Sequence, residues 1–126
     1  MLTSYSSRRE RLLLIPGVPK LDSYGEPTGD YAYDPDTAEP LWRSSLSRGS
    51  STANATTGTR VVEGITITDG EAVLIVLGRF ELTPELYRIK AEDGIWTPMG
   101  DPVTRYPIAS GTHSVVKMEK TESRRV

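Results

Sequence analysis

The sequence contains no cysteine, and its 126 residues include one histidine and one phenylalanine. Without cysteine, neither a disulfide framework nor a thiolate metal site can form. His113 would be the only candidate base of a Ser-His-Asp arrangement, and it falls within a predicted strand. A zinc site would need carboxylates for its remaining ligands. These absences favour a protein without a catalytic histidine or a bound zinc ion.

Long apolar runs are absent as well. No stretch approaches the roughly 20 apolar residues of a membrane span, so we expect no membrane partner. The run Leu12–Ile15 is too short for a secretory leader and follows closely on arginines. Hydrophobic residues make up 37% of the chain, and eleven glycines and nine prolines interrupt it. This composition predicts a small core with long loops, or a domain completed by neighbouring subunits.

Motifs that carry enzyme chemistry are also missing. The sequence has neither a GxGxxG nor a GxxxxGK[ST] phosphate-binding loop. Asp34 and Asp36 lie close together but lack the glycine and closing glutamate of a calcium loop. No pair of carboxylates is singled out for hydrolysis. We therefore expect no enzyme activity, cofactor or metal, with a small hydrolase built on scattered acids as the enzyme alternative.

The predicted fold class is mainly β: a small β-barrel of about six or seven short strands with long polar loops. Apolar or alternating segments between turn residues predict these strands. They are Arg11–Ile15, which stops at Pro16-Gly17, then Leu41–Arg43, Arg60–Thr68, Ala72–Leu77, Tyr87–Lys90, Ile95–Thr97 and Thr112–Lys120. Val18–Leu21 is expected to continue as an edge segment.

Turn residues predict how these strands connect. Asp69-Gly70 predicts a tight hairpin between Arg60–Thr68 and Ala72–Leu77, and Asp93-Gly94 predicts another. A single helical turn is expected at Leu82–Glu85, where a threonine precedes a proline. Because Ala72–Leu77 does not alternate, both of its faces should be covered. Trp42 is expected in the core or as a cap of the barrel.

The chain length predicts one domain over residues 1–126. Within it we expect a flexible N-terminal arm at 1–10, a long polar loop at 44–59 and a frayed C-terminal tail at 119–126. The loop at 44–59 is rich in serine and threonine and has one large apolar residue, Leu46. Too little surface can be buried there to offset the entropy of ordering it without a partner.

Charge is segregated along the chain, although the net charge is only −2. Residues 22–39 contain six acids and no lysine or arginine, and residues 40–60 contain three arginines and no acid. These segments are either solvated loops or two different interaction surfaces. The tyrosines of the acidic segment, Tyr24, Tyr31 and Tyr33, suit a contact surface. Alternatively they pack the segment onto its own domain, with Tyr31 and Tyr33 on one face of an extended chain.

A series of turns and apolar runs resembles that of a known family. The series comprises a hairpin at Asp22-Ser23-Tyr24-Gly25, a polar loop, the apolar strand Val73–Leu77, the step from Pro84 to Ile89, Asp93-Gly94, Gly100-Asp101-Pro102 and the final strand Val115–Lys120. In this order the features resemble the head-to-tail stopper, or head-closure, proteins of siphovirus-type tailed bacteriophages, especially those that infect actinobacteria.

The resemblance implies a structural virion protein of the phage neck, present in the host cytoplasm during assembly. Such a protein forms a ring, either a dodecamer or a hexamer, in the head-tail connector. The ring lies between the portal and adaptor complex on one side and the tail terminator or tail tube on the other. It closes the DNA channel after packaging, retains the genomic double-stranded DNA without sequence recognition, and provides the docking surface for the tail.

Two groups of residues are candidates for the contacts of such a ring. The polar loop and its flanks could face the channel, where few arginines would limit binding to phosphate. These residues are Arg43, Ser47, Arg48, Ser50, Asn54 and Arg60. The acidic segment could form the ring interface through Asp22, Tyr24, Asp30, Tyr31, Tyr33, Asp34 and Asp36.

Alternatives from the sequence remain open. A tail terminator or another neck or tail ring protein is also small, and a mainly helical adaptor would differ in secondary structure. A monomeric binding module of the OB or SH3 type belongs to another class. It predicts a monomer and salt-sensitive binding to oligonucleotides or peptides.

Overall fold

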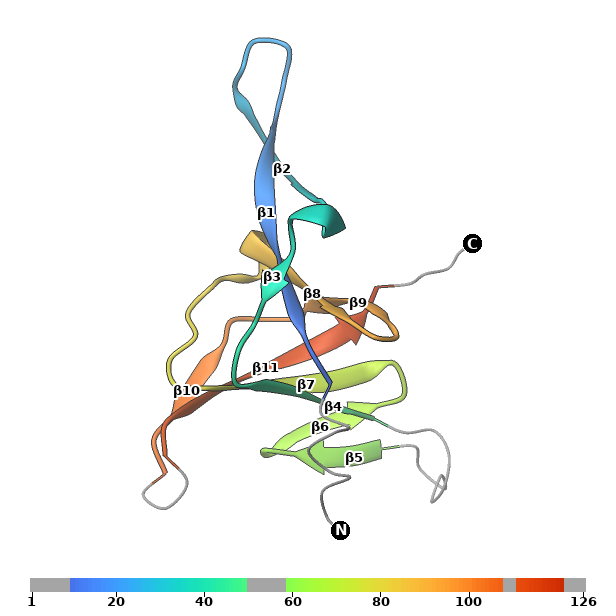
Figure 1. Ribbon diagram of the computed structural model, residues 1–126, viewed down its shortest axis with the longest axis vertical. Helices are drawn as coiled ribbons and strands as arrows, with labels where there is room; N and C mark the ends of the chain where they lie inside the picture. Colours follow the sequence, from blue (N-terminus) through green and yellow to red (C-terminus); the bar gives the residue numbers. More distant parts are fainter. Residues whose placement is uncertain (1–9, 50–58, 108–110, 122–126) are drawn as a thin grey trace.

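A computed structural model describes residues 10–49, 59–107 and 111–121 of the chain (Figure 1). These residues are mainly β, with eleven strands, more than the six or seven expected, and two short 3-10 turns. The elements are β1 (Leu13–Leu21), β2 (Pro27–Tyr33), η1 (Pro35–Thr37), β3 (Glu39–Pro40), β4 (Ser44–Arg48), β5 (Thr59–Val62), β6 (Ile65–Thr68), β7 (Glu71–Leu77), η2 (Pro84–Leu86), β8 (Tyr87–Ala91), β9 (Gly94–Pro98), β10 (Val103–Arg105) and β11 (His113–Lys120). None of the described segments forms a helix long and apolar enough to cross a membrane.

Nine of the strands form one antiparallel sheet in the order β2-β1-β8-β9-β11-β7-β4. β3 joins this sheet beside β1, and β10 joins it beside β11. The sheet curves around the core but does not close, because β4 at one end does not pair with β1 or β3 at the other. The predicted mainly β fold class is confirmed, but in place of the expected barrel the described residues form a sheet that is not closed.

The pair β7 and β11 forms the centre of the sheet, with a register that runs from Glu71 opposite Glu119 to Leu77 opposite His113. Alternate residues of β7 enter two different clusters, because successive side chains of a strand point to opposite faces. Leu74 belongs to the larger cluster, and Val73 belongs to a smaller one with Ile67. The prediction that both faces of this strand are covered is confirmed.

The smaller cluster exists because the β5–β6 hairpin lies over the second face of the sheet (Figure 1). Asp69-Gly70 was expected to pair β6 with β7, but β6 pairs with β5 through a tight turn at Glu63-Gly64. Both turn residues have positive φ, 54° and 79°, as such two-residue turns require. Asp69-Gly70 instead carries the chain from this hairpin into the main sheet, which leaves Ile67 fully buried.

Several boundaries also differ from the sequence expectations. β1 does not stop at Pro16-Gly17 but continues to Leu21, because its second half pairs with β2 on one edge. Glu119 and Lys120, expected in a frayed tail, pair with β9. The Asp93-Gly94 region does join two paired strands, β8 and β9, as predicted. The helical turn expected near Pro84 is η2.

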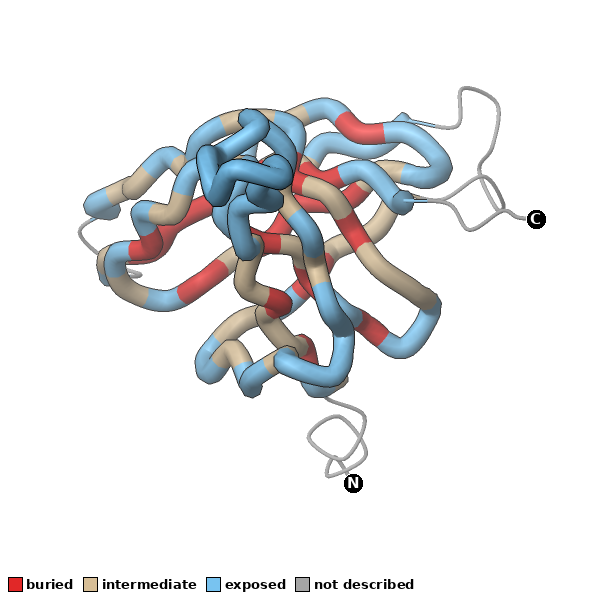
Figure 2. Tube along the Cα trace, turned by 90° about the horizontal axis from the view of Figure 1, so that it is seen from above, coloured by how far each residue is buried: buried red, intermediate tan, exposed pale blue. Residues whose placement is uncertain are grey.

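The β1–β2 hairpin leaves the body of the sheet, and we call its residues 18–32 the arm (Figure 1). Its turn is ordered by Asp22, whose Oδ1 accepts hydrogen bonds from the backbone N–H groups of Tyr24 and Glu26. Gly25 completes the turn with a φ of 82°. Exposed residues extend along the arm, whereas the buried residues lie in the body (Figure 2).

Arg48 of β4 spans the gap where the sheet fails to close. Its guanidinium donates two hydrogen bonds to Glu10, at 2.9 and 2.8 Å, and two to Asp93, both at 2.9 Å. It also lies over the ring of Trp96, 5.7 Å from the centroid. Glu10, the last residue of the N-terminal segment 1–10 that was expected to be flexible, is therefore anchored, since it also accepts a hydrogen bond from the backbone of Glu92.

These contacts lower the pKa values of both acids, Glu10 and Asp93. The hydrogen bond from Arg48 lowers the pKa of Glu10. Burial acts to raise the pKa of Asp93, but hydrogen bonds from Arg48 and Trp96, with the charges of Arg48 and Lys120, lower it to about 2. A lowered folded pKa contributes stability that is present above the unfolded value, about 4, and is lost as the pH falls toward the folded value.

We expect Arg48→Gln to lower the free energy of unfolding at pH 7 by about 1–2 kcal/mol, because it leaves two carboxylates without their shared cation. At pH about 2.5, near the pKa of about 2 of Asp93, that carboxylate is partly protonated, so the difference in unfolding free energy between the wild type and Arg48→Gln should shrink. Urea unfolding at both pH values measures it. Arg79→Gln is the control, because Arg79 forms only exposed contacts, an ion pair with Glu81 at 3.8 Å and a hydrogen bond to the Tyr106 hydroxyl at 3.1 Å. An equal effect of both substitutions would contradict the bridging role.

Candidate functional site

The residues predicted for a ring interface all lie on the arm or directly after it. Asp22 and Tyr24 are in its turn, and Asp30, Tyr31 and Tyr33 are in β2. Asp34 caps η1 by accepting a hydrogen bond from the backbone N–H of Asp36 at 3.0 Å. The structure thus brings the predicted set into one projecting element and the turn that follows it.

Tyr33 fixes the base of the arm to the body. Its hydroxyl donates a 2.7 Å hydrogen bond to the carbonyl of Glu85, and the Arg88 guanidinium lies 3.9 Å from its ring centroid. Gly17 fits tightly beneath, since a Cβ there would lie 2.6 Å from the Glu85 carbonyl oxygen and 2.8 Å from the Tyr33 ring. The tyrosines were expected either to form a contact surface or to pack onto their own domain, and Tyr33 packs onto its own domain.

Beyond this base, the arm exposes apolar and acidic side chains together. Tyr24 is 88% exposed, and Val18 and Leu21 are also more than half exposed. Glu26 and Asp30 form no ion pair with any described residue. The exposed apolar side chains gain nothing from contact with water, so their grouping on the arm is typical of a contact surface.

The residues predicted to face a channel do not form one loop. Ser47 and Arg48 belong to β4, which replaces the first five residues of the loop expected at 44–59. Arg60 is in β5, where its guanidinium donates to the Arg48 carbonyl at 2.6 Å. Ser50 and Asn54 lie outside the described residues. Arg48 is neutralised by two acids and is therefore not available to contact DNA.

Residues 41–43 form a corner between β3 and β4 rather than the predicted strand. Arg43 adopts a φ of 58°, and its carbonyl accepts a hydrogen bond from Leu77 N–H. Trp42 is 70% exposed, so its expected place in the core is wrong. The left-handed backbone at Arg43 reverses the chain there, and the indole is left on the surface.

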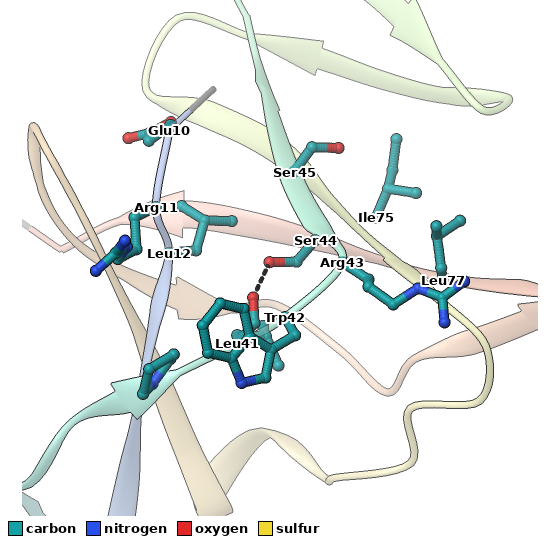
Figure 3. A pocket seen from close by; sticks show the side chains of 11 residues that line it. Glu10, Arg11, Leu12, Leu41, Trp42, Arg43, Ser44, Ser45, Ile75 and Leu77 are labelled. Atoms are coloured by element: carbon teal, nitrogen blue, oxygen red, sulfur yellow. Dashed lines mark hydrogen bonds between the residues drawn. The ribbon is translucent and has the colours of Figure 1, made fainter. Parts of the chain in front are cut away.

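A hollow of about 700 Å³ lies beside this corner, and we call it the corner pocket (Figure 3). Leu12, Ile75 and Leu77 contribute apolar side chains to its lining. Arg11 and Arg43 lie toward opposite sides in Figure 3, with Trp42 between them. Sequence analysis did not find this pocket, because its lining comes from three segments far apart in the chain.

The charges of the corner pocket are not balanced. Glu10 is also part of its lining, but its carboxylate is bound by Arg48. Neither Arg11 nor Arg43 forms an ion pair within the described part of the chain. The pocket therefore presents two cations and an exposed indole, a combination suited to acidic and aromatic or aliphatic groups.

The edge of β4 that points away from β7 faces this pocket. Leu77 N–H donates to Arg43 and Gly49 N–H donates to Glu71, so the odd-numbered residues of β4 face β7. The backbone groups of Ser44 and Leu46 therefore point away from β7. No strand of the described residues pairs with this edge. An extended segment from another chain could add there.

His113, the only histidine, is held at both ring nitrogens. Nε2 lies 3.0 Å from Glu63 Oε1 and Nδ1 lies 3.2 Å from the Gly111 carbonyl. Two acceptors favour the doubly protonated ring, so the hydrogen bond to Glu63 raises the pKa of His113. The described residues contain no group of three or more His, Cys, Asp or Glu side chains that could hold a metal ion. His113 joins the β5–β6 hairpin to β11 through its contact with Glu63.

Gly17→Ala is expected to destabilise the base of the arm by about 1–3 kcal/mol, because the new methyl group meets backbone atoms that must shift. Hydrogen exchange should become faster at the β1–β2 amides than elsewhere, which mass spectrometry of the exchanged protein would measure. Gly100→Ala is the matched control, since no atom lies within 4 Å of its added Cβ and its φ is not in the left-handed region. Equal protection in both variants would contradict the anchoring of the arm at Gly17.

Glu63→Gln should lower the pKa of His113, measured by NMR titration of its ring protons. A raised folded pKa means that the pair contributes stability below the unfolded value of about 6.5 and loses it as the pH rises through the folded value. The substitution should therefore reduce stability at pH about 5.5 more than at pH about 8.5. Glu81→Gln, which faces Arg79, should leave the titration unchanged. An unchanged pKa in Glu63→Gln would contradict the pairing.

No family model matches the sequence, and no curated protein shows significant similarity to it.

Proposed function

We propose that this chain is a ring-forming structural protein of a tailed-phage neck, of the head-closure type. In this role it closes the DNA channel after packaging and provides the surface to which the tail binds. Its partners are further copies of itself, the portal and adaptor complex, and the tail terminator or tail tube. The resemblance in the order of turns and apolar runs is the starting point, and the form of the domain supports it.

The observation that carries the proposal is the arm. Val18, Leu21 and Tyr24 project from the body on an exposed hairpin rather than entering either core cluster. Burying each of them in an interface would contribute about 1.5–3 kcal/mol, which a monomer does not recover. A protein whose domain is completed by neighbouring subunits accounts for this arrangement.

Two further observations agree with a ring. No strand within residues 10–49, 59–107 and 111–121 pairs with the outer edge of β4, an edge that a monomeric domain would normally protect. The net charge of −2 per chain, summed around a ring, would oppose tight binding of the DNA that passes through it. Arg48 is already paired with acids, so it adds no phosphate contact.

The experiment removes the gene from a phage that encodes this chain and supplies it from a plasmid as the control. We expect filled heads that lose their DNA and separate tails of normal length. Quantitative PCR of nuclease-treated heads measures DNA retention, and negative-stain electron microscopy measures the tails. Labelled protein should appear at the neck of complemented virions.

The alternatives give other results. A tail terminator predicts heads that retain DNA and tails of irregular length. A monomeric binding module predicts normal particles and no protein in the virion. Either result would overturn the proposed function.

A further inference from the structure

We infer that the corner pocket is the receptor for the arm of a second copy of this chain, so that copies associate head to tail. This inference rests on the proposed function, because a ring needs two different complementary surfaces on each subunit. It goes further by naming those surfaces. They are the arm, with Tyr24, Glu26 and Asp30, and the corner pocket, with Arg11, Trp42 and Arg43.

Charge complementarity is the first argument. Glu26 and Asp30 on the arm, and Arg11 and Arg43 at the pocket, make no ion pair within the described residues. Lys20 is the one cation of the arm, and Glu10 is the one acid of the pocket lining. Glu10 is already bound by Arg48, so the pocket keeps its positive character. Opposite charges of this kind guide association and fix its orientation.

Apolar complementarity is the second argument. The arm exposes Val18, Leu21 and Tyr24, and the pocket exposes Trp42 at 70% and Leu77 at 48%. An aromatic or aliphatic side chain that enters a hollow of about 700 Å³ can be largely buried. Aromatic residues and arginine are the types that most often dominate the energy of an interface.

The arm of one molecule cannot reach the corner pocket of the same molecule. Leu12 lines the pocket just before β1 begins, and Leu21 is the last residue of β1. Nine residues of extended chain separate them by about 30 Å. Figure 1 shows the arm extending away from the body along the long axis of the molecule. A stiff hairpin anchored at its base by Tyr33 cannot fold back, so its receptor must belong to another copy.

The backbone supplies a third complementary feature. Among the described strands, β2 pairs only with β1, and the backbone groups of Ser44 and Leu46 in β4 point away from β7 toward the pocket side. An arm lying beside β4 would satisfy such groups by adding strands to the sheet. Because arm and pocket are different surfaces, the contact is heterologous, and its repetition gives a ring when the rotation closes.

The test exchanges the charges of the two surfaces. One variant carries Arg11→Glu with Arg43→Asp, and aspartate is chosen because it tolerates the positive φ of Arg43. The other carries Glu26→Lys with Asp30→Lys and leaves the turn residue Asp22 intact. Sedimentation velocity and native mass spectrometry measure association at low and high salt. Arg79→Glu with Lys90→Glu is the control for a similar change of charge at other exposed sites.

We expect each variant alone to associate at least about 100-fold more weakly than the wild type, because like charges then face each other. An equimolar mixture should regain association to within about tenfold, since each arm again meets a pocket of opposite charge. The regained oligomers should contain the two variants in alternation. The control should associate like the wild type, and all associations should weaken with salt.

Association that both charge-reversal variants retain would overturn the inference, as would a mixture that regains nothing. A wild type that remains monomeric at about 1 mM would also overturn it. None of these results touches the loss of DNA from heads, which tests the proposed function by itself. Conversely, charge-dependent association with normal DNA retention would leave the arm and pocket in place and reject the neck function.

Discussion

The guanidinium of Arg48 joins β4 to two parts of the chain that lie beside β1 and β8, far from β4 in the strand order. It comes from β4 at one end of the open sheet, and it binds Glu10 just before β1 and Asp93 in the turn between β8 and β9. Because the backbone ladder does not continue between β4 and β1, side chains must hold these edges together. Trp96 lies below the same guanidinium and donates to Asp93, so the network also covers the end of the larger core cluster.

This arrangement explains why the sheet can remain open beside the corner pocket without losing its core. A closed barrel would pair β4 with β1 and would fill the space now lined by Leu12 and Ile75. The ion pairs of Arg48 hold the edges of β4 and β1 together at one end of β4. The corner at Trp42 and Arg43 keeps the two edges apart at the other end. The outer edge of β4 thus lies beside the pocket without a partner strand from the described part of the chain, while the interior stays covered.

The sequence predicted the elements whose signals are local. The uninterrupted apolar character of β7 indicated burial on both faces, and the alternation near residue 115 indicated β11. The wrong predictions of strand ends and turns arose where contacts between distant parts of the chain decided the structure. Pro16 and Gly17 would ordinarily end a strand, but β2 pairs beyond them. Asp69-Gly70 has the composition of a hairpin turn, but burial of Ile67 on the second face of the sheet favours the turn at Glu63-Gly64.

The candidate site also has one part with a local signal in the sequence and one part that depends on distant contacts. The acidic segment could be singled out as a candidate contact surface, because its acids and tyrosines lie close together in the sequence, but its strand β2 was not predicted. The corner pocket could not, because Arg11, Arg43 and Ile75 are brought together only by the curvature of the sheet. Trp42 illustrates the limit: a tryptophan in a short apolar segment normally predicts burial. Only the positive φ of Arg43 places it outside.

A ring built from arm and pocket contacts would not require a strong individual interface. In an open chain of copies one arm and one pocket remain unfilled, and closure fills both without recruiting a further subunit. The last contact is then intramolecular, with an effective concentration on the order of millimolar. Association that is modest in free solution can therefore give a stable ring once several copies gather on one platform. A weak, charge-guided contact also lets misplaced copies dissociate before the ring closes.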